Sequence, residues 1–96
     1  MTPEGRVKLK VKMLLALYSS TWGYMPVPYG YGKQALDFII CFRGKFLAIE
    51  TKAPGEDLTG PQRLCAVEIL EAGGTVFVIS EEAGLISLAR WLKLNS

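Results

Sequence analysis

Two strongly apolar runs, residues 36–42 and 46–52, follow each other along the chain with only three residues between them. Runs of this length that are rich in Ile, Phe and Leu are typical of β-strands. The linking segment Arg43-Gly44-Lys45 leaves room only for a tight turn, so the two runs are expected to pair as an antiparallel hairpin. The sequence therefore predicts a fold that is built around a β-sheet.

The segment after the hairpin predicts a helix and a further strand. Residues 53–58 form a turn rich in Pro, Gly and acid; Thr59 is then a typical helix N-cap, and Gln62 completes a capping box. A helix is expected over 61–72, where a Gly-Gly pair ends it, and a buried strand over 75–79. Because a helix that links two strands favours a right-handed parallel crossover, the predicted sheet is mixed.

Helices are also expected near both ends of the sequence. Residues 3–18 have helical apolar spacing with Thr2 as the N-cap, and a last helix is expected after residue 80. The first helix carries a second apolar stripe, which predicts a contact with a partner chain. The residues of that stripe are Leu9, Met13 and Leu17. The predicted order is α-β-β-α-β-α, an α/β fold with a mixed sheet flanked by helices, in one domain over 1–96.

The segment between the first helix and the hairpin, residues 19–34, is rich in Gly and Pro and predicts a long irregular loop. It contains four aromatic residues, Trp22, Tyr24, Tyr29 and Tyr31. Rings in such a loop either stack on the bases of a nucleic acid or anchor the loop to the protein core. Long loops without secondary structure are uncommon, which suggests a function for this one.

The chain has no histidine, which excludes Ser-His-Asp and Cys-His catalytic sites and zinc sites that use imidazole. Its two cysteines, Cys41 and Cys65, lie 24 positions apart among apolar neighbours and are expected to be buried thiols. No apolar run approaches the roughly 20 residues that span a bilayer, and no signal-peptide pattern is present. We therefore expect a cytosolic protein, in whatever cell hosts it, with no membrane partner.

Charged residues interrupt both strands of the predicted hairpin. Asp37 lies inside the first apolar run, while Glu50 and Lys52 end the second on one shared face, because they are two residues apart. A buried carboxylate is costly unless a cation or a hydrogen-bond donor compensates it. Two carboxylates from adjacent strands can hold a hard cation such as Mg²⁺, and the lysine can orient a water molecule or stabilise developing charge. The alternative is an ordinary salt bridge at the strand ends.

Together these residues resemble the signature of the PD-(D/E)XK nucleases, and most closely that of their VRR-NUC branch in its stand-alone phage and bacterial form. The resemblance covers about residues 30–80 in detail and implies a restriction-endonuclease-like core. Leu36 departs from it, because many relatives have Pro before the aspartate. The matching segments are Asp37, Glu50-Thr51-Lys52, Ala53-Pro54-Gly55, Leu58-Thr59-Gly60-Pro61-Gln62 and Gly73-Gly74-Thr75-Val76-Phe77-Val78.

The resemblance implies a centre for Mg²⁺ or Mn²⁺. Asp37 and Glu50 would be metal ligands, and Thr51 would add its backbone carbonyl. Glu4 aligns with the first-helix acid of many relatives, although an acid is also favoured at a helix N-terminus for its own sake.

Two further residues would take part in catalysis on this resemblance. Lys52 would act on the attacking water or on the phosphate, and Gln62 would orient the water or the DNA backbone. Capping of the helix is an equally good role for Gln62.

Basic residues are candidates for contacts with a DNA backbone. A net charge of +2 is weak evidence, but four basic residues crowd positions 6–12. We predict phosphate contacts from Lys8 and Lys12 in that helix, and from Lys33 and Arg63, which lie close in sequence to the predicted site. A solvated helix surface is the alternative for the helix lysines.

We therefore expect a metal-dependent, structure-selective DNA endonuclease. The sequence contains no base-reading module, so selectivity would depend on the shape of the DNA. A symmetric homodimer would present two sites to a four-way (Holliday) junction, and the stand-alone relatives are junction cutters. The alternatives are a non-catalytic DNA-binding or assembly module, a general or restriction-type endonuclease, and a small α/β scaffold whose charged trio is only ionic.

Overall fold

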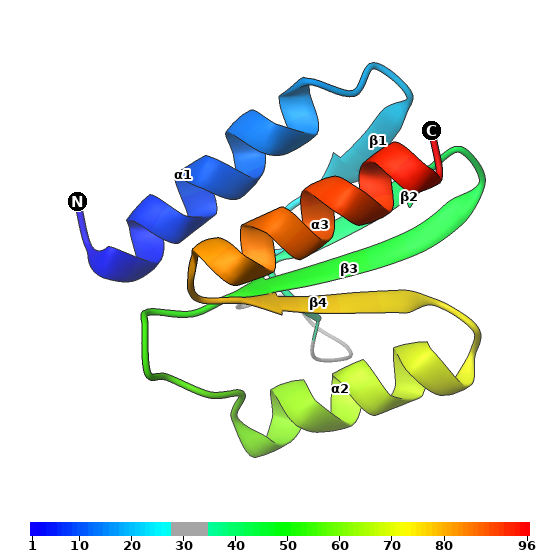
Figure 1. The fold of residues 1–96 in the computed structure, drawn as a ribbon. Helices are drawn as coiled ribbons and strands as arrows, with labels where there is room; N and C mark the ends of the chain where they lie inside the picture. Colours follow the sequence, from blue (N-terminus) through cyan, green and yellow to red (C-terminus); the bar gives the residue numbers. More distant parts are fainter. Residues whose placement is uncertain (28–34) are drawn as a thin grey trace.

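A computed structural model describes residues 1–27 and 35–96, and its chain consists of three helices and four strands within those ranges. Figure 1 shows their arrangement. The elements are α1 (Pro3–Ala16), β1 (Thr21–Tyr24), β2 (Phe38–Phe42), β3 (Lys45–Thr51), α2 (Gly60–Glu71), β4 (Thr75–Ile79) and α3 (Glu82–Leu94).

The four strands form one mixed sheet in the order β1-β2-β3-β4. Strands β1 and β2, and β2 and β3, pair antiparallel, whereas β3 and β4 are parallel and are linked through α2. The predicted hairpin, the parallel crossover and the mixed sheet are thus confirmed. Together with the three helices they make the chain an α/β protein.

The helices cover the two faces of the sheet unequally: α1 and α3 lie on one face and α2 lies on the other (Figure 1). The larger core lies under α1 and α3, and the smaller core, formed by Leu36, Ala48 and Cys65, lies under α2. The larger core contains Val7, Val11, Leu15, Phe38, Ile40, Phe42, Leu47, Ile49, Ile79, Leu88 and Leu92.

The turn between β2 and β3 consists of Arg43 and Gly44, flanked by the pair Phe42 and Lys45. Both turn residues have positive φ, 49° and 82°. Positive φ at both central positions is the mark of a two-residue turn whose twist matches that of the strands. The turn fixes the register of the hairpin, and that register decides which residue of β3 lies beside Asp37.

The prediction of a loop over 19–34 is wrong at Thr21–Tyr24, which is strand β1 and pairs with β2. Gly23, which suggested a loop, is what allows the pairing. A Cβ at this position would lie 2.4 Å from the Ile40 side chain and 2.6 Å from the Ile39 carbonyl oxygen. The prediction for Tyr29 and Tyr31 falls outside the described residues.

The two cysteines differ in exposure, so the prediction of two buried thiols holds only for Cys65. Cys41 is exposed because its cross-strand partners are Trp22 and Phe46, on the part of the sheet that α2 does not cover. Within the described ranges, no helix combines the length and the apolar character needed to cross a membrane.

Candidate active site

The predicted site residues gather at one end of the sheet. Strands β2 and β3 are antiparallel, so the start of β2 lies beside the end of β3. Asp37 directly precedes β2, in a bend rather than inside the strand as predicted, and Lys52 directly follows β3. The start of α2 brings Gln62 to the same place, and α1 brings Glu4.

Three carboxylates form a cluster at this end. Glu4, Asp37 and Glu50 each offer an oxygen, and these oxygens all lie within 4.8 Å of one another. The structure therefore brings the acid of the first helix together with Glu50 of β3 and with Asp37, which directly precedes β2. Oxygen ligands of this kind suit hard divalent cations such as Mg²⁺.

Asp37 is fixed by Thr51, the residue after Glu50. The Thr51 N–H and hydroxyl donate hydrogen bonds to Asp37 Oδ2, at 3.0 Å and 2.6 Å. Thr51 is fully buried, so the two bonds are shielded from solvent. The resemblance suggested only the carbonyl of Thr51 as functional. The side chain was missed, although the hairpin register was a signal that could have found it.

Glu50 is only 3% exposed and is held on both of its oxygens. Its Oε1 accepts a hydrogen bond of 3.0 Å from the backbone N–H of Asp37. Its Oε2 accepts one of 3.1 Å from Gln62 Nε2 and lies 3.9 Å from Lys52 Nζ. The predicted trio of Asp37, Glu50 and Lys52 is therefore a connected group, anchored to α2 by the Gln62 amide.

The pKa of Glu50 is raised from 4.5 to about 7. Burial is the largest cause, and the negative charge of Asp37 is the second. The hydrogen bond from the Asp37 N–H and the positive charge of Lys52 oppose the rise without cancelling it. Because its neighbours leave this carboxylate short of positive charge, a divalent cation fits the electrostatics of the cluster.

Gln62 fills the capping role that was weighed for it, and its side chain also contacts the site. Its backbone N–H donates to Thr59 Oγ1 at 3.3 Å and its side-chain Oε1 accepts from the Thr59 N–H at 3.0 Å, which completes the capping box. With Oε1 engaged in the cap, Nε2 points to Glu50. The helix cap therefore positions a group of the site.

Of the four predicted DNA-contacting residues, only one is seen to lie at the site. Lys8 reaches the cluster, with its ammonium 3.8 Å from Asp37 Oδ1. Lys12, farther along α1, instead lines a cavity beside Tyr18 and Tyr24. Arg63 pairs with Asp57 at 3.2 Å, and Lys33 falls outside the described residues.

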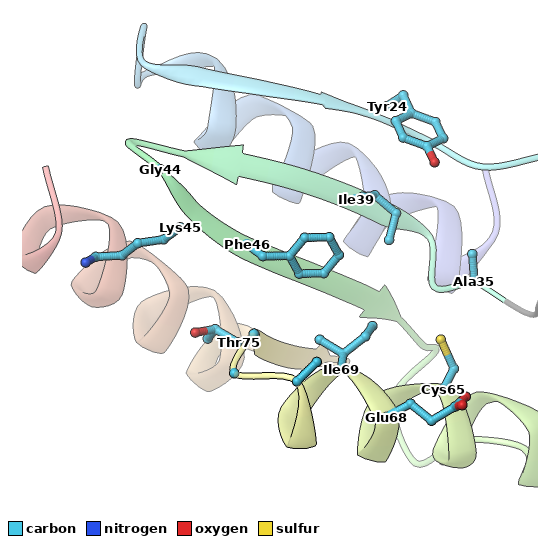
Figure 2. Close-up of a pocket in the computed structure, with 13 residues that line it drawn as sticks. Tyr24, Ala35, Ile39, Gly44, Lys45, Phe46, Cys65, Glu68, Ile69 and Thr75 are labelled. Atoms are coloured by element: carbon cyan, nitrogen blue, oxygen red, sulfur yellow. The ribbon is translucent and has the colours of Figure 1, made fainter.

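A cavity of about 900 Å³ lies on the face of the sheet that α2 covers in part. Figure 2 shows Tyr24, Ile39 and Phe46 of the sheet on one side and Cys65 and Ile69 of α2 on the other. Sequence reasoning missed this cavity, because it depends on how far α2 extends over the sheet. Tyr24, one of the aromatic residues that the sequence singled out, lies in its lining.

No family model, curated protein or solved structure matches this chain. Its function is therefore inferred from the site itself.

Proposed function

We propose that this protein is a divalent-cation-dependent nuclease that hydrolyses the phosphodiester bonds of DNA, on a restriction-endonuclease-like core of the VRR-NUC type. The observation that carries the proposal is the cluster of Glu4, Asp37 and Glu50 with Lys52 beside it. An ordinary salt bridge would need one carboxylate for each ammonium, and it would not require a third acid within 4.8 Å of the other two.

The donor set fits Mg²⁺ or Mn²⁺. Glu4, Asp37 and Glu50 would hold the ion, with the Thr51 carbonyl as the further ligand that the resemblance implies. When bound, such an ion neutralises a phosphodiester and lowers the pKa of a bound water molecule. Its positive charge would also offset the burial that raises the pKa of Glu50.

The residues around the carboxylates hold the site in place before substrate arrives. Thr51 fixes Asp37, and Gln62 fixes Glu50. The ammonium of Lys52 is held beside Glu50, and 13% of its side chain remains open to solvent, where it can meet the attacking water or the phosphate. A polar site fixed in this way needs little rearrangement when charge develops.

A homodimer is part of the proposal. Leu9 and Met13 of α1 and the C-cap residue Leu17 are all exposed, so the described residues leave this second apolar stripe uncovered. A two-fold dimer through this stripe would place two sites across one axis, which matches the approximate symmetry of a four-way DNA junction. Selectivity would then follow the shape of the DNA. A location in the cytoplasm remains a prediction.

The test is a cleavage assay over single-stranded, duplex, flap and four-way-junction DNA with Mg²⁺ or Mn²⁺. We expect the junction to be cut fastest by the wild type and not at all by Asp37→Asn. Glu71→Gln, which changes an exposed acid on α2, is the control. Cation-dependent binding without cleavage would instead identify a non-catalytic DNA-binding module. Equal cutting of duplex and junction would identify a general endonuclease.

A further inference from the structure

Lys8 reaches the acidic cluster from α1. Its ammonium lies 3.8 Å from Asp37 Oδ1, and the two side chains are 30% and 23% exposed, so solvent screens the pair only in part. Glu4 stands four residues earlier on the same helix. Residues four apart in a helix lie on the same side. Helix α1 therefore contributes both a carboxylate, from Glu4, and an ammonium, from Lys8, to the cluster.

The two oxygens of Asp37 have different surroundings. Oδ2 accepts both hydrogen bonds from Thr51, which fix the carboxylate. Oδ1 is the oxygen turned toward Lys8. A cation bound at Oδ1 would therefore stand close to the Lys8 ammonium, and the two positive groups would repel each other.

The charges of the site favour replacement of Lys8 by a divalent cation as the partner of Asp37. With all three carboxylates ionised, these groups and the Lys52 ammonium present Lys8 with a formal charge of −2, and a divalent cation changes it to 0. The net attraction that holds Lys8 at the cluster is thus lost when the cation binds, and a cation at Asp37 Oδ1 repels the nearby ammonium directly. Its long, flexible stem allows the ammonium to move while the helix stays in place.

We propose that Lys8 is a positioning residue that couples cation binding to DNA binding. In the cation-free chain it is the counter-ion of Asp37. A divalent cation at the cluster displaces it, and the released ammonium then pairs with a DNA phosphate beside the site. This inference rests on the proposed nuclease function, and it gives Lys8 a role that a fixed phosphate contact would not have.

The first measurement is a calorimetric titration with Mn²⁺ in the absence of DNA, at constant ionic strength. It compares the wild type with Lys8→Met and with a matched control, Lys10→Met. Lys10 lies on the same helix and pairs with Glu82 at 3.9 Å, outside the acidic cluster. We expect Lys8→Met to bind Mn²⁺ about three- to fivefold more tightly, as the loss of a competing ion pair implies, and Lys10→Met to match the wild type.

The second measurement is the affinity for a labelled four-way junction with and without Ca²⁺, which reports binding independently of turnover. In the wild type, we expect the cation to raise DNA affinity, and linkage requires DNA to raise cation affinity by the same factor. Lys8→Met should lose most of this gain, whereas Lys8→Arg, which keeps the charge, should retain it.

The outcomes separate the two proposals. Equal Mn²⁺ affinity in the wild type and Lys8→Met would overturn the coupling by Lys8, and so would a gain in DNA affinity that survives in Lys8→Met. A wild type that binds no Mn²⁺, or binds it equally well after Glu50→Gln, would overturn the nuclease proposal itself.

Discussion

Strand β3 places an exposed aromatic ring and a buried carboxylate on the same face of one sheet. Phe46, near the start of the strand, is 45% exposed, whereas Glu50, four residues later, is 3% exposed. The usual arrangement is the reverse, with rings inside and carboxylates outside. Both ends of β3 therefore depart from the pattern that stabilises a sheet, and such departures are expected at surfaces that bind something.

The two ends depart from that pattern for different physical reasons. At the carboxylate end, hydrogen bonds from the Asp37 backbone and Gln62 hold Glu50 in one position. At the aromatic end, α2 covers only part of the sheet and leaves the cavity beside Tyr24 and Phe46 (Figure 2). The first end is a fixed polar site, and the second is an apolar surface formed by incomplete coverage. A fixed polar site suits a catalytic reaction, and an apolar surface suits contacts that can adjust to a bound partner.

The largest effect is expected from neutralising the buried carboxylate. Glu50→Gln keeps the size of the side chain and an oxygen that can accept from the Asp37 N–H. We expect cleavage to slow by about 10²-fold or more, as comparable losses of electrostatic stabilisation do. Initial rates on the four-way junction provide the measurement.

Glu71→Gln is the matched control, because the same change is made at an exposed position on α2. It should cut at the wild-type rate. Circular dichroism should show both variants folded, since removing one of three clustered negative charges relieves repulsion. Near-normal cleavage by Glu50→Gln would mean that the unusual burial of this residue is structural only.

The second prediction concerns stability against pH in the absence of divalent cations. Because the pKa of Glu50 is about 7 in the folded chain and near its ordinary 4.5 when unfolded, the folded state binds the proton more tightly. The contribution of Glu50 to the free energy of unfolding should therefore be highest below pH 4.5 and should fall as the pH rises through 7. The contribution is on the order of 2–3 kcal/mol.

Denaturant unfolding between pH 5 and pH 8 measures this slope. Glu50→Gln has no proton to lose at this position and should flatten the slope, while Glu71→Gln should leave it unchanged. Adding Mn²⁺ at pH 8 should recover stability in the wild type, because a ligand of the folded state stabilises it. A wild type whose stability rises steadily over this range would contradict the assignment.

The third prediction concerns the support of Asp37. Thr51→Val keeps the shape of the buried side chain and removes the hydroxyl that donates to Asp37 Oδ2. Residues that orient metal ligands typically contribute about tenfold or more to metal affinity. We expect Mn²⁺ to bind about tenfold more weakly to Thr51→Val in a DNA-free titration. Thr75→Val, at the start of β4, is the control; an equal loss in both would indicate a general effect on the sheet.

Much of the fold could be predicted because its signals are local. The short turn at Arg43 and Gly44 sets the hairpin, and the Thr59 and Gln62 capping box marks the start of α2. The same turn sets the hairpin register, so the pairing of Phe38 with Ile49, which brings Asp37 next to Glu50, follows from residues close together in sequence.

The features that were not predicted depend on contacts between distant segments. Strand β1 exists because Gly23 fits against Ile40 of β2, and nothing near Gly23 in the sequence indicates that partner. The contact of Lys8 with Asp37 depends on how α1 lies across the end of the sheet. The cavity depends on the extent of α2. The hydroxyl of Thr51 is the exception, because its contact with Asp37 follows from the register that the local turn sets.

The smallest effect is expected at the aromatic end. Tyr24 is 54% exposed and lines the cavity, and its ring lies 6.0 Å from that of Trp22 on the same strand. If this surface stacks on unpaired bases, Tyr24→Ala should weaken binding to the junction by about fivefold, roughly 1 kcal/mol, and Tyr24→Trp should preserve it.

Two oligonucleotides that differ only in whether they carry bases separate stacking on the Tyr24 ring from binding through charge. An abasic oligonucleotide keeps the phosphates of a thymidine oligonucleotide and lacks the rings, so it binds through charge alone. Tyr24→Ala should lose affinity for the thymidine strand and not for the abasic one. Leu94→Ala, at an exposed position at the end of α3, should affect neither. Equal losses on both strands would show that Tyr24 supports the fold or the charge of the surface. Only the carboxylate end of β3 would then have a functional role. The exposure of Phe46 would follow simply from the fact that one helix covers only part of this face of the sheet.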